Sequence, residues 1–263
     1  MSSISPSAVI LQMLQLAQNA GQEIMRIYAS DFAVKTKEDA SPVTRADAMA
    51  EKIILAGLAK HWPNVPVLAE EAAAAGVIPV LAERFFLVDP LDGTKEFISR
   101  NGEFTVNIAL IENAKPIAGV VYAPALGKVF WGQSGAGAAN ALLALNQNVA
   151  EIDWTPIHVR PAPADGLTVV ASRSHMDAAT TDYLAQHKVK TLTSAGSSLK
   201  FCLVAAGEAD LYPRFGRTME WDTGAGQAVL EAAGGTVCDL DQSPLTYGKS
   251  GRGFDNPAFI ASA

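Results

Sequence analysis

Apolar residues recur every three or four positions through residues 10–28, which predicts an amphipathic helix near the start of the chain. Ser5 and Pro6 come before this pattern, and such a pair is typical of a helix start, with serine at the cap and proline in the first turn. A polar link at residues 35–45 follows, and a second helical pattern extends over about residues 47–61. Two helices are therefore expected in the first quarter of the chain.

Short runs rich in β-branched and aromatic residues predict strands in the middle of the chain. Residues 104–111 partly alternate between apolar and polar side chains, and residues 117–122 return as a β-branched run after a turn, which is typical of a hairpin. The Gly/Ala-rich stretch at 132–143 favours no element. The strands expected here are 65–69, 84–88, 104–111, 117–122 and 128–131.

Strands and helices alternate in the second half, which indicates an α/β arrangement. The sequence pattern changes at a proline-rich stretch near residues 150–163. We therefore predict two packed subdomains, an N-terminal α+β unit at 1–155 and a C-terminal α/β unit at 156–263. The elements expected in the second are strands at 168–171, 189–192, 209–212 and 236–238, and helices at 177–186, 197–206 and 222–233.

Composition narrows the possible function classes. The chain has 263 residues, 49% of them hydrophobic and 18% charged, so it can bury a large core. Its net charge of −7 argues against a nucleic-acid partner, because nothing would drive counterion release from a polyphosphate. Cys202 and Cys238 lie in apolar surroundings without metal or disulfide spacing, and we expect both to be buried.

Location and assembly are only partly constrained by the sequence. No signal-peptide pattern and no apolar run of about 18 residues is present. We therefore expect a cytoplasmic protein without stable membrane insertion, and peripheral association with the inner face of a membrane stays open. Whether the protein is a monomer or a homodimer also stays open.

The most informative segment is residues 89–94, which read Asp-Pro-Leu-Asp-Gly-Thr directly after an apolar run. Proline cannot donate to a strand ladder, so we expect Pro90 to end the strand just after Asp89. The Leu91 carbonyl would then turn outward beside the carboxylates of Asp89 and Asp92. Three oxygen ligands thus fall within a few residues.

The following residues add an anion-binding element. Gly93 permits a tight turn, and residues 94–98 could start a helix whose free N–H groups point at a phosphate. Taken alone, residues 92–94 are more typical of an ordinary turn and helix cap. Glu70 and Asp222 lie at the ends of other predicted elements, and carboxylates that converge near apolar strands need a cation to hold them together. Because Mg²⁺ prefers such oxygen ligands, the pattern favours a metal-assisted phosphatase.

These motifs carry a family resemblance. Glu70-Glu71, the segment 89–94 and Trp-Asp-x-x-Ala-Gly at 221–226 resemble, in this order, the lithium-sensitive, magnesium-dependent phosphatases that include inositol monophosphatase. The resemblance covers nearly the whole chain and implies a layered α-β-α-β-α sandwich of the inositol monophosphatase and fructose bisphosphatase type. Within that family the chain most resembles the 3′(2′),5′-bisphosphate nucleotidase branch of the bacterial CysQ type, on the motifs at 41–44, 89–97, 101–107, 196–201 and 212–215.

The resemblance implies a site for two or three Mg²⁺ ions. Glu70, Asp89 and the Leu91 carbonyl would hold one ion. Asp89, Asp92 and Asp222 would hold a second, and a third would lie near Glu70 through waters. Two such cations can stabilise the attacking and departing oxygens of an in-line displacement.

The resemblance also implies the catalytic residues. Thr94, paired with Asp47, would orient and deprotonate the attacking water, and Glu70 would join them through its metal ion. Lys37 would lie at the edge of the metal site, and the amides of Gly93 and Thr94 would hold the scissile phosphate.

A second set of residues bears on the substrate. Ser197, Lys200 and Arg214 can supply a hydroxyl, an ammonium and a guanidinium to a phosphate that is not cleaved. From the residues alone, a helix cap and two solvated charges explain them equally well. The resemblance assigns all three to a retained 5′-phosphate and places His175 near the adenine or ribose. The substrate contacts implied in this way are Glu70, Leu91, Asp92, Gly93, Thr94, His175, Ser197, Lys200, Arg214 and Asp222.

The expected activity is Mg²⁺-dependent hydrolysis of the 3′-phosphate of adenosine 3′,5′-bisphosphate to AMP and phosphate. The sulfated precursor nucleotide is a further candidate substrate, so the resemblance implies a role in sulfur assimilation and inhibition by lithium. An inositol monophosphate or other sugar phosphatase with the same metal core is the alternative. A non-catalytic metal or nucleotide sensor is a third hypothesis, disfavoured because a sensor has no need for the pair of Thr94 and Asp47.

Overall fold

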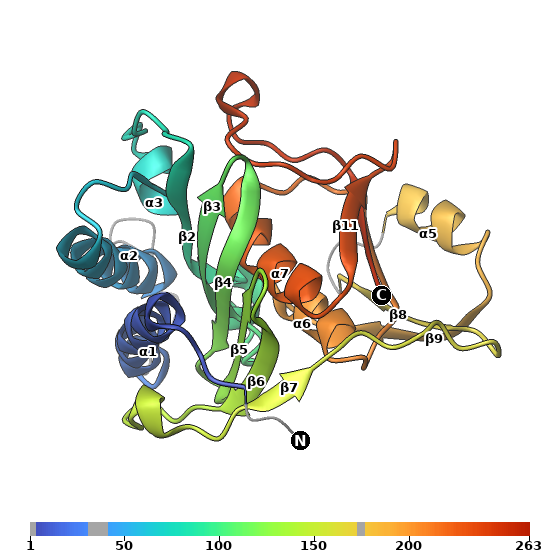
Figure 1. Cartoon of the computed structure of the whole chain (residues 1–263), viewed down its shortest axis with the longest axis horizontal. Coiled ribbons are helices and arrows are strands. Elements are labelled where there is room, and N and C mark those ends of the chain that lie inside the picture. The colour runs from blue at the N-terminus through green and yellow to red at the C-terminus, as the bar shows by residue number, and fades with distance from the viewer. Residues whose placement is uncertain (1–3, 31–41, 173–176) are drawn as a thin grey trace.

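Helices and sheets alternate in five layers in the computed structural model, which describes residues 4–30, 42–172 and 177–263 (Figure 1). Helices α1 (Ala8–Tyr28) and α2 (Pro42–His61) form the first layer, and a seven-stranded sheet forms the second. Helices α6 (Leu199–Ala205) and α7 (Glu220–Ala232) lie between this sheet and a five-stranded sheet, beyond which lies α5 (Ala178–Leu184). The predicted α-β-α-β-α layering is therefore confirmed.

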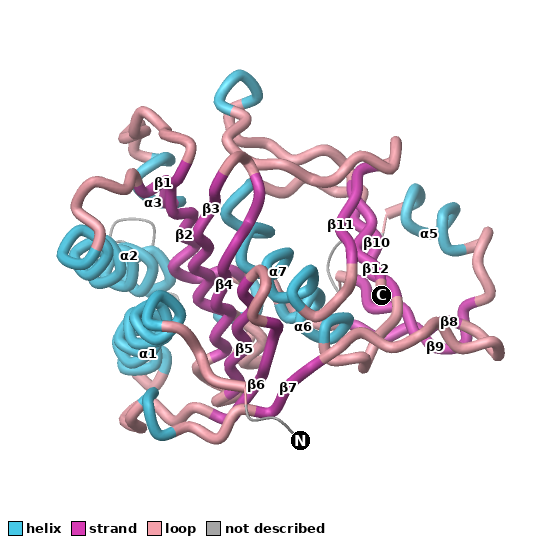
Figure 2. Tube along the Cα trace, in the orientation of Figure 1, coloured by secondary structure: helices cyan, strands magenta, loops and turns pink. Residues whose placement is uncertain are grey.

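The first sheet is a meander in which strand order follows the chain from β1 to β7 (Figure 2). β1 and β2 pair in parallel, and all later neighbours pair antiparallel. Between β1 and β2 the chain forms the short helix α3 (Glu70–Ala74), and between β2 and β3 the short helix α4 (Thr94–Ile98). The strands are β1 (Val67–Ala69), β2 (Arg84–Asp92), β3 (Thr105–Glu112), β4 (Lys115–Ala123), β5 (Lys128–Gln133), β6 (Gly137–Leu142) and β7 (Thr155–Ile157).

The second sheet has the order β11-β12-β10-β8-β9. β8 pairs in parallel with both β9 and β10, whereas β12 runs antiparallel to β10 and β11. This sheet places the end of β10 beside the middle layer of helices. Its strands are β8 (Leu167–Ala171), β9 (Val189–Ser194), β10 (Leu211–Arg214), β11 (Thr236–Asp239) and β12 (Phe259–Ser262).

Two apolar cores lie on opposite faces of the first sheet. One packs α1 and α2 against the sheet, and the other joins the sheet to α6, α7 and the second sheet. α7 approaches the first sheet so closely that a Cβ added at Gly119 of β4 would lie 2.5 Å from the carbonyl oxygen of Ala225. This close packing fixes the height of α7 over the sheet and hence the place of the helix start that carries Asp222.

Several predicted boundaries were wrong. The side chain of Ser7, not Ser5, caps α1, by accepting from the amide of Ile10. α2 begins at Pro42, within the predicted polar link, because Val43 and Ala46 already face the core. The expected strand end after Asp89 was also wrong.

β2 continues to Asp92 for a physical reason. β1 accompanies it only as far as Val88, so Pro90 lies where no strand of the first sheet pairs on that side of β2. Pairing to β3 is interrupted between Asp89 and Asp92 by a register shift and then resumes at Thr105. A proline is tolerated at such an irregularity because no ladder hydrogen bond is lost.

The structure adds three strands that the sequence did not predict, β6, β7 and β12, and the short helix α3. β7 belongs to the first sheet, although the predicted division after residue 155 runs through it. The division into two subdomains stays a prediction. Of the two free cysteines, Cys202 is buried as expected, but Cys238 is only partly buried. No helix within the described ranges is long and apolar enough to cross a membrane.

Candidate active site

Two parallel strands bring the first two acidic residues together. β1 and β2 pair in parallel so that Ala69 lies opposite Val88. The next residue along the chain is Glu70 after Ala69 and Asp89 after Val88. Repulsion from the Glu70 carboxylate contributes, after burial, to raising the pKa of Asp89. Asp89 is almost fully buried, with 1% of its surface exposed, and its Oδ1 accepts from the Leu91 amide at 3.0 Å.

α2 supplies a third acidic residue to this group. Asp47 is 6% exposed, and its Oδ1 has no hydrogen-bond partner among the residues that the structure describes. One helical turn later, the buried Glu51 accepts from the amides of Glu71 and Ala72 at 2.8 and 2.9 Å. Glu51 therefore ties α2 to the start of α3, which holds Asp47 and Glu70 at the same end of the sheet.

The turn after β2 has the conformation that its glycine permits. Gly93 has φ of 99°, in the left-handed region, and α4 begins directly after it at Thr94. A Cβ at Gly93 would lie 2.3 Å from Ser197 Oγ. The chain thus needs glycine here both for the turn and for the close approach of the 195–198 loop.

Asp222 reaches the site from the far side of the first sheet. α7 starts at Glu220, two residues earlier than predicted, so Asp222 lies in the first turn of the helix. Its Oδ2 accepts from the Met219 amide at 2.8 Å, and its backbone carbonyl accepts from Ser198 Oγ at 2.8 Å. These bonds orient the carboxylate and join α7 to the loop before α6.

Burial and mutual repulsion raise the pKa values throughout this acidic group. Desolvation, followed by repulsion from neighbouring carboxylates, raises the pKa of Asp47 to about 8 and that of Glu70 to about 7. The same causes raise the pKa of Asp222 to about 8, and hold that of Asp89 well above its usual range. Burial also raises the pKa of Asp92, against the attraction of Lys200. A divalent cation would relieve this repulsion.

The donor chemistry of the group fits Mg²⁺. All its side-chain donors are hard carboxylate oxygens, and the buried, unpartnered Oδ1 of Asp47 is an acceptor still to be satisfied. Within the described ranges no three His, Cys, Asp or Glu side chains form a ready-made cage. Mg²⁺ commonly takes one or two carboxylates and keeps several waters, so such a cage is not required. The individual metal ligands and the pairing of Thr94 with Asp47 stay predictions.

A cavity of about 230 Å³ opens beside Asp92 and Asp222. The turn at residues 92–94, the loop before α6 and the end of β10 all contribute to its wall. Its wall therefore carries both carboxylates and cations. Its lining is Asp92, Gly93, Thr94, Lys95, Glu96, Ser172, Ser197, Lys200, Phe201, Tyr212, Arg214, Thr218, Asp222 and Thr223.

Lys200 is buried in this wall rather than solvated. Only 6% of its surface is exposed, and its Nζ donates to the carbonyl oxygens of Ser197 at 2.6 Å and Ala195 at 3.3 Å. The ammonium also lies 5.4 Å from the ring centroid of Tyr212. Desolvation lowers the pKa of Lys200 to about 8. The alternative of an ordinary surface charge is therefore wrong for this residue.

Ser197 and Arg214 line the same cavity but already have backbone partners. Ser197 Oγ lies 2.7 Å from the carbonyl oxygen of Asp92 and 2.8 Å from that of Glu103, and its single proton serves one of them at a time. Arg214 donates to the carbonyls of Gly216 and Arg217, each at 3.1 Å. Arg214 keeps further N–H donors for a ligand. The predicted alternative of a Ser197 helix cap is wrong, because α6 is preceded by Ser198.

The structure adds residues that the sequence reasoning did not assign. Tyr212 alternates with Arg214 on β10, and this spacing of two was the available signal. Asn107, 1% exposed, donates to Asp92 Oδ2 at 3.4 Å from the facing strand β3. Asn107 ends the motif at 101–107 but was given no role from the sequence, and no sequence signal indicated Glu51. The predicted Lys37 and His175 lie outside the described residues.

Comparisons with known proteins agree with this geometry. The model of the inositol monophosphatase family matches residues 6–260. The 3′(2′),5′-bisphosphate nucleotidase CysQ of Salmonella typhimurium is 48% identical over 250 residues, which cover 94% of this chain and 97% of that protein. The protein of the same name in Escherichia coli strain K12 is 48% identical over 253 residues, covering 95% and 98%.

A solved structure shows the same architecture. CysQ from Bacteroides thetaiotaomicron, described as a bacterial member of the inositol monophosphatase family, superimposes with a TM-score of 0.81 at 40% identity, and the match covers 96% of each chain. The expected family, fold type and phosphatase class are thereby confirmed.

Proposed function

Because the chain belongs to the inositol monophosphatase family, we propose that it is a Mg²⁺-dependent phosphatase that converts adenosine 3′,5′-bisphosphate to AMP and phosphate. One observation carries the choice of substrate: the buried ammonium of Lys200 shares a cavity with Asp92 and Asp222. A ligand with two phosphates can place one at the acidic, metal-binding end and the other at the cations. Relatives that are 48% identical over nearly their whole length bear the name of this activity, which supports the proposal.

Mg²⁺ would be held by Glu70, Asp89 and the Leu91 carbonyl, and by Asp92 and Asp222 with Asp89. When bound, it supplies charge neutralisation at the phosphate and lowers the pKa of a coordinated water. The acidic residues would hold two or three such ions, and the ions would in turn neutralise the buried carboxylates. Lithium would inhibit by competing for one of these sites.

The hydroxyl of Thr94 is the proposed proton acceptor from the attacking water, and Asp47 accepts the hydroxyl's own proton. Thr94 lies on the cavity wall at the first position of α4, and Asp47 has an unpartnered buried oxygen. The left-handed turn at Gly93 orients the amides at the start of α4 towards the scissile phosphate, where they stabilise its developing charge.

The retained 5′-phosphate would bind Lys200 and Arg214, with Ser197 at its edge. Two cations of different shape suit a phosphate monoester, since the guanidinium can bind two oxygens and the ammonium a third. The sulfated precursor nucleotide carries the same 3′-phosphate, so a cytoplasmic role in sulfur assimilation follows from the proposal.

A comparison of two phosphate esters tests this choice. Phosphate release from adenosine 3′,5′-bisphosphate and from inositol 1-phosphate is measured at equal concentrations with Mg²⁺. We expect a strong preference for the nucleotide, because only it has a second phosphate for Lys200 and Arg214. Equal or faster turnover of the inositol ester would favour the sugar phosphatase alternative.

A further inference from the structure

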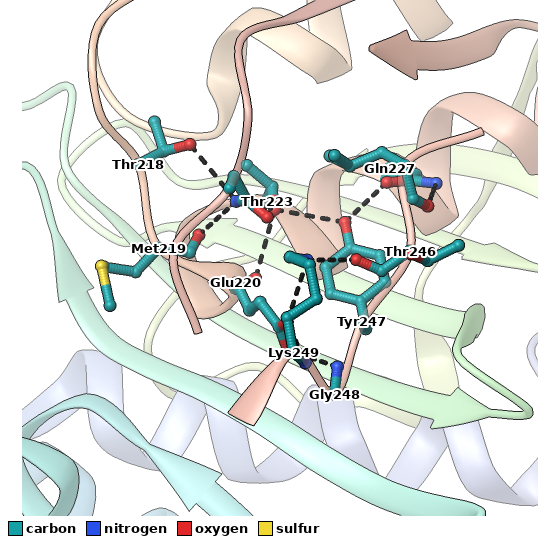
Figure 3. Close-up of polar contacts among 11 residues, drawn as sticks. Thr218, Met219, Glu220, Thr223, Gln227, Thr246, Tyr247, Gly248 and Lys249 are labelled. Atoms are coloured by element: carbon teal, nitrogen blue, oxygen red, sulfur yellow. Dashed lines mark hydrogen bonds and ion pairs between the residues drawn. The ribbon is translucent and has the colours of Figure 1, made fainter. Parts of the chain in front are cut away.

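A buried polar network holds the start of α7, two residues before Asp222 (Figure 3). The side chain of Glu220 is completely buried, yet it ends in a carboxylate. Its two oxygens accept from the amides of Gly248 and Lys249 at 2.7 and 2.8 Å. Lys249 Nζ completes the set at 2.9 Å from Glu220 Oε1. A buried charge of this kind is tolerated only when it is paired and hydrogen-bonded, so the arrangement fixes the 248–249 turn on the helix start.

A second connection comes from Asn256. This residue is 5% exposed, and its Nδ2 lies 2.8 Å from the Met219 carbonyl oxygen, 3.0 Å from Thr223 Oγ1 and 3.2 Å from Thr218 Oγ1. The backbone amide of Asn256 also donates to the carbonyl of Thr218 at 2.9 Å. One side chain thus holds the residues on both sides of the helix start.

Tyr247 adds a third connection deeper in the helix. Its hydroxyl lies 2.6 Å from Gln227 Oε1 and 3.2 Å from Thr223 Oγ1, and Gln227 Nε2 donates to the Leu245 carbonyl at 3.1 Å. The segment 245–256 is therefore bound to α7 over its first two turns. Figure 3 shows these contacts converging on the helix from one side.

The network reaches the carboxylate of Asp222 through the backbone of Met219. Asn256 binds the Met219 carbonyl, and the Met219 amide donates to Asp222 Oδ2 at 2.8 Å. The amide of Glu220 donates to the Phe254 carbonyl at 2.9 Å. Neither Asn256 nor Glu220 lines the cavity, so neither is placed to touch a substrate.

We propose that Glu220 and Asn256 are positioning residues, which fix Asp222 for metal binding through the segment 245–256. The inference rests on the proposed function, because it takes Asp222 to be a ligand of Mg²⁺. A ligand held in its binding orientation loses less freedom when the ion arrives, and partners behind metal ligands commonly contribute about ten-fold or more to metal affinity.

Two isosteric substitutions test the inference, and the chain offers a matched control. Glu220→Gln places an amide group against backbone N–H donors, and Asn256→Asp places a carboxylate against the Met219 carbonyl. Gln18→Glu makes the same amide-to-carboxylate change as Asn256→Asp elsewhere, because the buried Gln18 donates to the carbonyls of Ala144 and Gln147, each at 2.7 Å, on the opposite side of the first sheet. Lys249→Met removes only the ion pair and leaves both amide contacts of Glu220 in place.

The measurements are the dissociation constant of Mn²⁺ by calorimetry without nucleotide, the Mg²⁺ concentration for half-maximal activity, KM for the nucleotide, and Tm. We expect both metal constants to rise about ten-fold in Glu220→Gln and Asn256→Asp, with little change in KM. Gln18→Glu should lower Tm without changing the metal constants. Lys249→Met should show a smaller rise, and it decides the matter if the two buried variants do not fold.

Metal constants that are unchanged in the folded variants, or that rise equally in Gln18→Glu, would overturn the inference. Failure of the proposed function is a separate outcome, because it would show in the unsubstituted protein. That protein would then bind no Mn²⁺ or release no phosphate with Mg²⁺.

Discussion

Glu70, at the end of β1, lies beside Asp89 of the parallel strand β2. Their pairing follows from the register of β1 and β2, in which Ala69 lies opposite Val88. Burial and repulsion from neighbouring carboxylates raise the pKa of Glu70 to about 7 and hold that of Asp89 well above its usual range. A divalent cation that binds here would therefore displace protons, so that metal binding would depend on pH.

This coupling predicts how stability depends on pH. The pKa of Asp47 and that of Asp222 are each raised from 3.8 to about 8, so the folded metal-free protein binds more protons than the unfolded chain between these values. Its free energy of unfolding should fall as pH rises from about 4 to about 8. Thermal unfolding across this range, with and without Mg²⁺, measures the effect, and Mg²⁺ should raise Tm more at pH 8 than at pH 6.

A pair of variants distinguishes the effect of the acidic group on stability from that of the protein's overall negative charge. Asp222→Asn should flatten the pH dependence of the metal-free protein, whereas Asp241→Asn, at an exposed position, should not. A metal-free protein that becomes more stable between pH 5 and 8 would contradict this account.

Lys200 should determine the preference for a second phosphate. In Lys200→Met we expect kcat/KM for adenosine 3′,5′-bisphosphate to fall about 10- to 100-fold, the value of a charge-assisted hydrogen bond. Adenosine 3′-monophosphate lacks the 5′-phosphate, so its turnover should change little. Steady-state kinetics on both nucleotides gives the answer, and equal losses on the two would show that Lys200 does not bind the retained phosphate.

Thr94 should affect the chemical step and not binding. Thr94→Ala removes the proposed proton acceptor, and kcat should fall about 10²- to 10⁴-fold. Nucleotide affinity, measured by calorimetry, should be largely kept. Thr94→Ser retains a hydroxyl and serves as the control, with activity close to that of the unsubstituted protein. An unchanged rate in Thr94→Ala would remove this residue from the mechanism.

Gly93 should tolerate no side chain. Gly93→Ala adds a Cβ in a left-handed conformation and against Ser197 Oγ, so we expect a loss of about 1–3 kcal/mol in the free energy of unfolding. Phosphatase activity should fall as well, since the turn orients the start of α4. Gly251→Ala is the matched control, because a Cβ there has no heavy atom within 4 Å and should change stability by less than about 0.5 kcal/mol. Urea unfolding distinguishes the two variants, and equal stabilities would contradict the role given to Gly93.

Local sequence signals predicted the features that depend on neighbours in the chain. The helix at 94–98 was expected from the glycine turn before it, and the layered fold followed from the family resemblance. The start of α2 was missed although Val43, Ala46 and Ala50 already follow helical spacing. The polar residues between them obscured that pattern.

Other features depend on distant contacts and leave no local signal. β6 is rich in glycine and alanine, and it is a strand because β5 and β7 pair with it on both sides. Lys200 was open to two explanations until the structure showed that its helix is buried between two sheets. Glu51 and Asn256 could not be recognised at all, since their partners lie about 20 or more positions away.

We propose that acidic residues from three separate segments of the chain bind divalent cations in one pocket. Anomalous diffraction from crystals soaked in Mn²⁺, recorded near the manganese absorption edge, tests it most directly. We predict two or three peaks in contact with oxygens of Glu70, Asp89, Asp92 and Asp222. Peaks elsewhere on the protein, or no peak among these four residues at saturating Mn²⁺, would contradict the account.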